Sequence, residues 1–341
     1  RRRTMTRLVQ LQHPTHGRAV ALVDEPNLVM LDGFDSVVAL ARHALTNGVR
    51  LAAAAQKACG SKQLAYDTVY DGGDAWALLP CVDHPTEPAR CHVAGTGLTH
   101  KASALNRQAM HDASGQKHDE PVTDSMRMFR WGLEGGRPKP GDIGVQPEWF
   151  YKGTGQILRG HGQPLIVPDF ADDGGEEPEV AGLYLIDDDG NPRRLGLATG
   201  NEFADHVMER KNYLYLAPSK LRTGAIGPEL IIEPDFHDVS GQVRIVRGGR
   251  DVWTKAIKTG EANMSHTLAN MEYHQFKYPQ HRRPGDVHVH YFGADAFSFG
   301  EGVALEDGDV MEVSWQGFGR PLRNPVRIDR GTARYVEVKP V

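Results

Sequence analysis

DDGGEEPEVAGLYLID, residues 172–187, places two glutamates at the entrance to a segment without charges. Glu177 and Glu179 are two positions apart, and side chains at i and i+2 of a β-strand project from the same face. Both carboxylates can therefore converge on one cation. Hard divalent ions such as Mg²⁺ take oxygen ligands and keep waters that a substrate can displace. The stretch predicts a strand that begins at a metal site; a solvated acidic hairpin is the alternative, since carboxylates are mostly exposed.

A second cluster follows in residues 200–232, GNEFADHVMERKNYLYLAPSKLRTGAIGPELII. Glu202 comes directly after the strand-like LGLATGN, and Lys220 precedes another apolar strand. Most lysines are solvated, but a position between apolar segments predicts burial. Lys220 is therefore a candidate for a positive charge inside the site.

Short strands dominate the chain around these two clusters. From residue 147 to residue 341 they are separated by Gly, Pro and Asp-Gly, and Asp189-Gly190 predicts a hairpin turn. Only 204–210 and 262–276 predict helices there. The polar region 111–145, with one short helical stretch, predicts a mobile lid.

The first part of the chain predicts a small α+β domain over residues 5–88. Antiparallel strands with a turn near residues 16–17 are followed by an alanine-rich region, 35–59, with the periodicity of two helices. The proline-rich stretch 83–90 predicts a linker to a β-rich catalytic domain over residues 89–341. Residues 1–4 precede the first methionine and are set aside as an extension.

Composition excludes several classes of protein and partner. The 341 residues carry a net charge of −5 without long basic runs, which gives no electrostatic footprint for nucleic acid. No window of about 18 apolar residues predicts a membrane span. The 3 cysteines have no C-x-x-C spacing, so we expect no disulfide framework and a cytoplasmic location.

The order of these motifs resembles the fumarylacetoacetate hydrolase superfamily over residues 90–325. In that family a Glu-x-Glu pair leads into a strand, an Asn-acidic pair supplies a third metal carboxylate, and a later lysine faces the substrate. Phe150-Tyr151-Lys152-Gly153 is similar to the family's Phe-x-Lys segment. GEANMSHTLANMEYH at 260–274 is similar to its helix before the last strands, and PGDVHVHYFGA at 284–294 with LEDGDVMEVSWQGFGRPLRNPV at 305–326 to its closing pattern.

The resemblance implies a mixed α+β, strand-dominated fold with a β-sandwich or β-roll core and a small N-terminal α+β domain. It also implies a homodimer and a site that binds Mg²⁺, with Mn²⁺ or Ca²⁺ as alternatives. The implied metal ligands are Glu177, Glu179 and Glu202. Three carboxylates against a divalent ion leave one negative charge, so an anionic substrate needs added positive charge. The implied sources of that charge are Lys220, Lys152 and Arg222.

Two departures from the family bear on the reaction. In GTGLTHKASA, residues 95–104, Ser103 stands where hydrolytic relatives have the histidine that activates water. His100 is the nearest histidine and is a candidate acid. Gly293-Ala294 stands where relatives keep a threonine hydroxyl that hydrogen-bonds substrate, which costs about 1–3 kcal/mol of recognition if the partner stays unpaired.

The resemblance is closest to a subgroup that degrades non-phosphorylated sugar acids. It implies a Mg-dependent dehydratase, a lyase acting on a 2-keto-3-deoxy acid of the pentonate type through a metal-stabilised enolate, with Lys220 as base. The alternatives are a hydrolase that cleaves a C–C bond of a 2,4-diketo acid and a non-catalytic sugar-acid binding protein. Missing water activation at Ser103 favours elimination.

Overall fold

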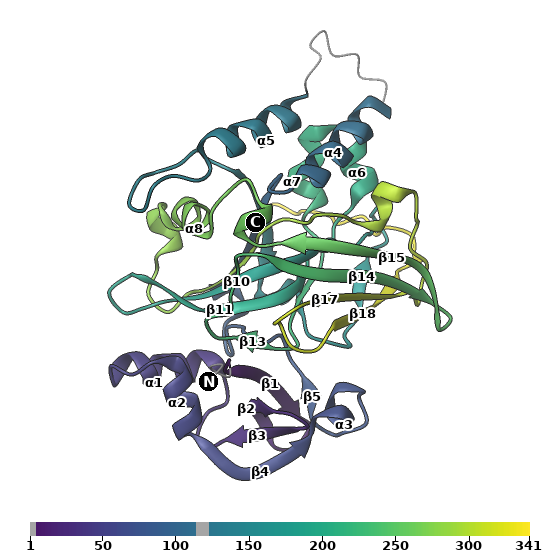
Figure 1. Ribbon diagram of the computed structural model, residues 1–341. Helices are drawn as coiled ribbons and strands as arrows, with labels where there is room; N and C mark the ends of the chain where they lie inside the picture. The colour runs from purple at the N-terminus through teal and green to yellow at the C-terminus, as the bar shows by residue number, and fades with distance from the viewer. Residues whose placement is uncertain (1–4, 114–122) are drawn as a thin grey trace.

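The computed structural model describes residues 5–113 and 123–341 of the chain. Within these residues a main sheet of 13 strands and a second sheet of 5 strands form the core, and helices lie at the periphery (Figure 1). The main sheet contains β1 (Arg7–His13), β2 (Gly17–Asp24), β3 (Asn27–Leu31), β4 (Cys59–Ala65), β5 (Ala77–Leu78), β6 (Cys91–Gly97), β7 (Glu148–Thr154), β8 (Leu158–Arg159), β10 (Pro178–Ile186), β11 (Pro192–Asn201), β12 (Gly224–Ile226), β13 (Leu230–Ile231) and β16 (Val287–Tyr291).

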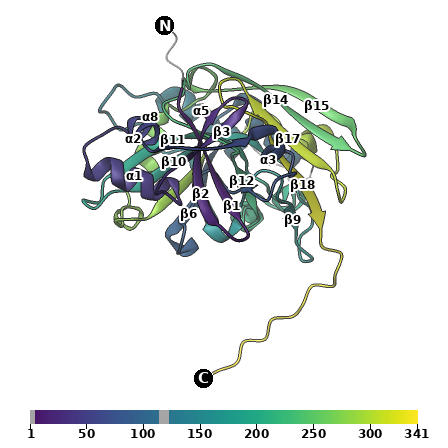
Figure 2. The ribbon, with the colours of Figure 1, turned by 90° about the horizontal axis from the view of Figure 1, so that it is seen from below.

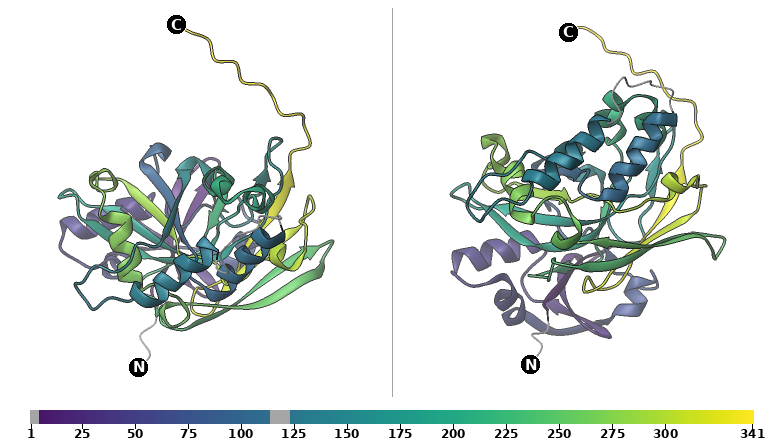
Figure 3. Two further views of the ribbon diagram at one scale, coloured as in Figure 1. Left: turned by 90° about the horizontal axis from the view of Figure 1, so that it is seen from above. Right: turned by 45° about the horizontal axis from the view of Figure 1, so that its top comes forward.

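The second sheet lies beside the main one and is ordered β15-β14-β17-β18-β9. Its strands are β9 (Leu165–Val167), β14 (Val239–Arg247), β15 (Arg250–Thr259), β17 (Val310–Trp315) and β18 (Leu322–Ile328). After β18 the chain runs away from the body, as seen from below and from above (Figures 2 and 3). The predicted strand-dominated, mixed α+β class is confirmed.

Most helices of the described residues belong to one of two groups. Those of the N-terminal part flank its strands, whereas α4 to α7 gather above the ends of β10 and β11 (Figure 1). The helices are α1 (Val37–Thr46), α2 (Leu51–Lys57), α3 (Tyr66–Tyr70), α4 (Lys101–Ala113), α5 (Asp124–Gly135), α6 (His206–Lys211), α7 (Leu216–Ser219) and α8 (Leu268–Phe276). Ser36 caps α1 by accepting from the backbone N–H of Ala39, as its position before the alanine-rich region predicts.

The N-terminal part is continuous with the rest of the main sheet. β1 pairs antiparallel with β13, and one hydrophobic cluster contains Leu8 and Leu40 from the N-terminal part together with Leu183 and Val289 from β10 and β16. The division at residue 88 stays a prediction. The predicted lid falls partly on residues 114–122, which lie outside the described residues; its described portion includes α5.

The β10–β11 hairpin creates the part of the fold that matters for the site. The two strands pair antiparallel from Ile186↔Pro192 to Pro178↔Asn201, and the turn between them contains Gly190 at φ 80°. Because the strands are antiparallel, the residues before β10 and after β11 meet at the open end of the hairpin. β10 is buried along its whole length and β11 from Leu195 onward, so the polar side chains at the open end, among them Glu179, are enclosed.

Candidate metal centre

The open end of the β10–β11 hairpin brings three glutamates together. Glu177 precedes β10, Glu179 is its second residue, and Glu202 follows β11. The backbone N–H of Glu202 donates to the carbonyl of Glu177 at 2.9 Å, so backbone pairing fixes the two segments against each other. One carboxylate oxygen from each of the three lies within 4.8 Å of the others, and all three side chains are buried. This places the predicted ligands around a single point.

Lys220 lies among these carboxylates. Its Nζ donates to both oxygens of Glu177 at 2.8 and 2.9 Å and to Glu202 Oε2 at 2.6 Å, and it lies 4.7 Å from the centre of the Phe150 ring. The side chain is 1 % exposed. The backbone of α7 ends at this residue, with Lys220 as its C-cap, which aims the side chain at the hairpin.

A lysine that acts as a base needs a lowered pKa, and in the structure the pKa of Lys220 is shifted the other way. Burial lowers the pKa of Lys220, but Glu177, Glu202 and Glu209 together raise it above its usual value. These carboxylates, two of them at hydrogen-bond distance, outweigh desolvation because their charges act in a poorly screened interior. Lys220 is therefore an ammonium donor in this arrangement.

The carboxylates themselves are unevenly charged. Burial raises the pKa of Glu177, but Lys220, Glu202 and His206 bring it well below its usual value. Burial and the neighbouring carboxylates hold the pKa of Glu179 well above it. The same two causes raise the pKa of Glu202 to about 8, with Lys152 and Lys220 opposing them. The cluster thus has a deficit of positive charge at Glu179.

The missing positive charge at Glu179 tests whether a divalent ion fits this site. Glu179 accepts a hydrogen bond from the backbone N–H of Gly293 at 2.7 Å, but within the described residues it has no cationic side chain at ion-pair distance. An all-oxygen set of clustered carboxylates is the donor chemistry that Mg²⁺ and related ions prefer. The residues present therefore fit such an ion.

Lys152 neutralises the charge of Glu202 without lining the cavity. Its Nζ is 2.7 Å from Glu202 Oε1 and donates to the carbonyls of Phe203 and Lys220, and the side chain is fully buried. It is not among the residues that line the cavity at the glutamates. The predicted substrate contact of Lys152 is thus not what its position favours; the lysine balances the charge of Glu202.

The cavity at the glutamates is small. Its free volume of about 10 Å³ is room for about one water molecule, so an ion and a substrate require side chains to move. Three of the predicted residues line it in addition to Lys220 and two of the glutamates: Ser103, Gly293 and Ala294.

Sequence reasoning missed several residues around this cavity. Arg107 and Glu209 line it, and Arg107 Nε lies 2.8 Å from Glu209 Oε1. Arg107 also pairs with Glu148 of β7. Ser103 and Arg107 are four residues apart on α4 and so share one helix face, a spacing that could have identified Arg107. Glu209 had no such signal, because its approach depends on how α6 packs against α4.

Two predicted residues are not brought to the cavity. His100 is 1 % exposed and lies between the hydroxyls of Thr99 and Thr259, at 2.9 and 3.2 Å. Thr99 donates its only hydroxyl proton to the carbonyl of Phe292, so His100 Nδ1 carries hydrogen and Nε2 accepts. Burial lowers the pKa of His100 to about 4. A neutral histidine held this way does not reach a substrate, which corrects its assignment as the acid.

Arg222 is the second of these residues. Its Nη2 lies 3.0 Å from Asp205 Oδ2, and its guanidinium lies 5.3 Å from the centre of the Phe170 ring. Asp205 is the N-cap of α6, so the arginine is held at the start of that helix. Its predicted contact with substrate is therefore corrected to a contact with the helix cap.

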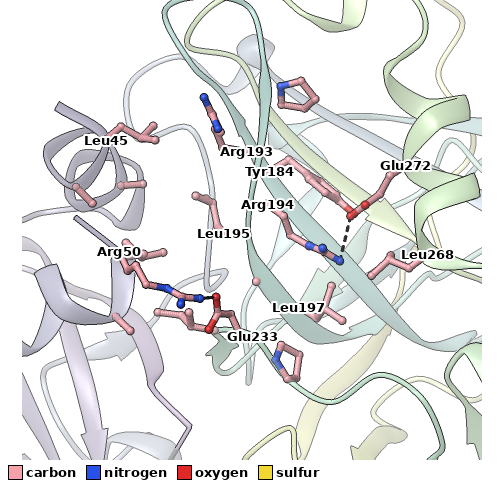
Figure 4. Close-up of a pocket in the computed structure, with 18 of the residues that line it drawn as sticks. Leu45, Arg50, Tyr184, Arg193, Arg194, Leu195, Leu197, Glu233, Leu268 and Glu272 are labelled. Atoms are coloured by element: carbon pink, nitrogen blue, oxygen red, sulfur yellow. Dashed lines mark hydrogen bonds and ion pairs between the residues drawn. The ribbon is translucent and has the colours of Figure 1, made fainter. Parts of the chain in front are cut away.

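A much larger cavity lies elsewhere in the described residues. It has a volume of about 690 Å³ and is bordered by α1, α2, the β10–β11 hairpin and α8 (Figure 4). Its charged groups are paired, Arg50 with Glu233 and Arg194 with Glu272. Tyr184 donates to Glu272 at 2.8 Å. Size alone does not make it the functional site, because it contains no cluster of metal-ligand or acid–base groups.

Known proteins share this fold. A curated relative, 2-dehydro-3-deoxy-D-arabinonate dehydratase of Saccharolobus solfataricus, is 26% identical over 188 residues, 54% of this chain and 59% of the relative. A solved structure of 2-keto-3-deoxy-D-arabinonate dehydratase complexed with magnesium and 2,5-dioxopentanoate matches 95% of this chain and 100% of that chain, with a TM-score of 0.69 and 18% identity. The chain shares the fold of this sugar-acid dehydratase.

A more distant solved structure shows the same fold. It is 2-hydroxyhepta-2,4-diene-1,7-dioate isomerase from Mycobacterium marinum, with a TM-score of 0.57 and 14% identity over 95% of this chain and 98% of that chain. No family model matches the chain. The matches confirm the resemblance to the sugar-acid subgroup of the fumarylacetoacetate hydrolase superfamily that the motifs indicated. The chain aligns with little more than half the length of the curated relative.

Proposed function

We propose that this protein is a Mg²⁺-dependent dehydratase of a 2-keto-3-deoxy sugar acid of the pentonate type. The observation that carries the proposal is the buried cluster of Glu177, Glu179 and Glu202 with Lys220 among them. The dehydratase fold supports it, as does the magnesium and 2,5-dioxopentanoate named for one protein of that fold.

Charge balance supports a 2-oxo acid as the ligand. The three glutamates and the two buried lysines, Lys152 and Lys220, sum to one negative charge. A divalent ion changes that sum to one positive charge, which the carboxylate of a 2-oxo acid neutralises. Such an ion, held by the three glutamates, would polarise the keto group and make the neighbouring C3–H acidic.

The side chains of the cavity divide the remaining work. Lys220 is the group that can take the C3 proton, because glutamates that hold a divalent ion no longer stabilise its ammonium form as they do here. Ser103, in the lining, is the group that can give a proton to the departing C4 hydroxyl. Arg107 supplies positive charge on the same side. Ala294 lacks a hydroxyl and leaves recognition of the substrate to these groups.

Elimination is favoured over C–C hydrolysis because none of the described residues that line the cavity is a histidine. Ser103 occupies the helix position from which a histidine could activate water, and His100 is directed to two threonines. Cleavage of a 2,4-diketo acid therefore lacks the base that it needs.

Product identification tests the proposal. The purified protein with Mg²⁺ is incubated with a 2-keto-3-deoxypentonate and, in a parallel reaction, with a 2,4-diketo acid. We expect the first to lose one water and form a 2,5-dioxo acid, with no turnover of the second. Two shorter fragments from the diketo acid would establish the hydrolase, and binding without any turnover would establish a sugar-acid binding protein.

Variants test whether turnover depends on Lys220. We expect Lys220→Met to lower kcat by about 10²–10⁴-fold, the range for losing one acid–base group. Glu134→Gln, at an exposed position of α5, is the control and should leave kcat unchanged. The homodimer rests on the resemblance and the cytoplasmic location on the cysteine content, and both are proposed with the same function.

A further inference from the structure

His206 makes one polar contact, and that contact is to a proposed metal ligand. It is the first residue of α6 and is fully buried. Its Nε2 lies 2.8 Å from Glu177 Oε1. A carboxylate that also accepts from Lys220 acts here as an acceptor, so Nε2 carries the hydrogen and donates.

The ring of His206 is held by two phenylalanine rings and by backbone at its edge. Phe297 is stacked on it, with ring centres 4.6 Å apart and an angle of 13°, and Phe299 lies 5.3 Å away. A Cβ at Gly175 would lie 2.5 Å from Nδ1, so the backbone there is tight against the ring. Nδ1 has no hydrogen-bond partner among the described residues. The ring can therefore direct its hydrogen bond only to Glu177.

Glu177 is consequently held from two directions. Oε1 accepts from both His206 and Lys220, and Oε2 accepts from Lys220 at 2.9 Å. A Lys220 that leaves the carboxylates to meet a substrate no longer orients Glu177. The histidine contact does not depend on Lys220, because it comes from α6 rather than α7.

We propose that His206 is a positioning residue that fixes the orientation of the Glu177 carboxylate toward a bound divalent ion. The inference rests on the metal site of the proposed function. Hydrogen bonds to a metal ligand from the layer around it orient the ligand, and their loss typically costs 10–100-fold in metal affinity or activity.

The experiment measures Mn²⁺ binding by calorimetry and the EPR spectrum of bound Mn²⁺, in the full chain without substrate. His206→Phe keeps an aromatic ring between the phenylalanines but removes the donor. His206→Gln keeps an N–H donor, and His206→Asn is too short to reach Glu177. Phe299→Leu removes one ring contact and leaves the donor in place, and it is the matched control.

We expect His206→Phe and His206→Asn to raise the Kd for Mn²⁺ by about 10–100-fold and to alter the EPR spectrum. His206→Gln should restore most of the affinity, and Phe299→Leu should keep it. Thermal unfolding without metal checks that each variant is folded, and the asparagine and glutamine pair suffices if the phenylalanine variant is not.

Two results would overturn the inference: an unchanged Kd in both variants that lack the donor, or an equal loss in Phe299→Leu, which would assign the effect to packing. A natural chain that binds no Mn²⁺ would instead reject the metal site of the proposed function.

Discussion

Glu179 is the residue whose environment is least favourable in the absence of an ion. It is buried, lies beside two other carboxylates, and accepts a hydrogen bond from the backbone N–H of Gly293. We expect Glu179→Gln to abolish Mg²⁺ binding and turnover while raising the Tm of the metal-free protein, since glutamine removes the cost of burying a carboxyl group beside two others. Each kcal/mol gained raises Tm by about 2–4 °C in a chain of about 150–250 residues, and by less in a chain of 341 residues.

Calorimetric titration and thermal unfolding, with and without a chelator, measure the two effects of Glu179→Gln. For the natural chain we expect chelation to abolish turnover and to lower Tm. A glutamine variant that binds Mg²⁺ like the natural chain would show that Glu179 is not a ligand.

His100 predicts a loss of stability in acid. Its pKa is lowered from 6.5 to about 4 by burial, so the unfolded chain binds more protons than the folded one between those pH values. The free energy of unfolding therefore falls as pH drops through this window, by about 3 kcal/mol from this residue. In urea unfolding at a series of pH values, the free energy of unfolding of His100→Gln should fall less steeply as the pH is lowered. An equal slope in that variant, or a change in the exposed control His16→Gln, would contradict this account.

At the scale of the element, the β10–β11 hairpin depends on glycine. Gly200 pairs with Glu179 across the two strands, and a Cβ at that position would lie 2.7 Å from the ring of the buried Tyr291. The ring is tied down, because its hydroxyl donates to the carbonyl of Ala225 at 2.9 Å. Space at residue 200 is therefore needed for the register that holds Glu179 and Glu202 together.

We expect Gly200→Ala to lower the free energy of unfolding by about 1–3 kcal/mol, the usual cost of overpacking, and to weaken Mg²⁺ binding. Urea unfolding and calorimetric titration measure the two effects. Gly73→Ala is the matched control, since its nearest neighbour, a Thr68 methyl, would lie at an ordinary 3.4 Å. Full Mg²⁺ affinity in Gly200→Ala would show that the hairpin tolerates the shift without moving its ligands.

At the scale of the whole molecule, the N-terminal part and the catalytic sheet are joined by a buried polar contact as well as by a common core. Glu229, at the start of β13, is fully buried and pairs with Arg7 of β1 at 3.0 Å. Tyr66 donates to it at 2.9 Å, and the backbone N–H of Arg320 donates at 3.2 Å. The positive charge of Arg7, in the N-terminal part, thus neutralises the carboxylate of Glu229 in the rest of the chain.

We expect the described molecule to unfold in one transition, with equal calorimetric and van't Hoff enthalpies. Arg7→Met leaves a buried carboxylate without its cation and should lower the stability of that single transition by about 3 kcal/mol. Arg327→Met, which removes an exposed arginine of β18, is the control. Differential scanning calorimetry that resolves a separate transition for residues 5–88 would show that the two parts fold independently.

No helix within the described ranges, 5–113 and 123–341, has the length and apolar character needed to cross a membrane. Buried acidic groups gather at the proposed metal site. Four buried carboxyl groups, those of Glu177, Glu179, Glu202 and Glu209, lie at one end of the hairpin.

The sequence alone identified the candidate metal ligands and the class of fold. Glu177, Glu179 and Glu202 could be found because they stand next to strands, and a strand imposes its periodicity locally. Lys220 could be found because apolar segments surround it. These signals are carried by residues close together in the chain, so no long-range packing is needed to read them.

The tertiary structure alone decided which other side chains reach those ligands and in what state. His206, Arg107 and Glu209 come from helices whose approach depends on packing between distant segments, while His100 and Arg222 are turned to Thr99 and Asp205 by contacts that have no local pattern. The protonation of Lys220 was decided there too, because a pKa depends on distances and burial, and these exist only once strands far apart in sequence have met.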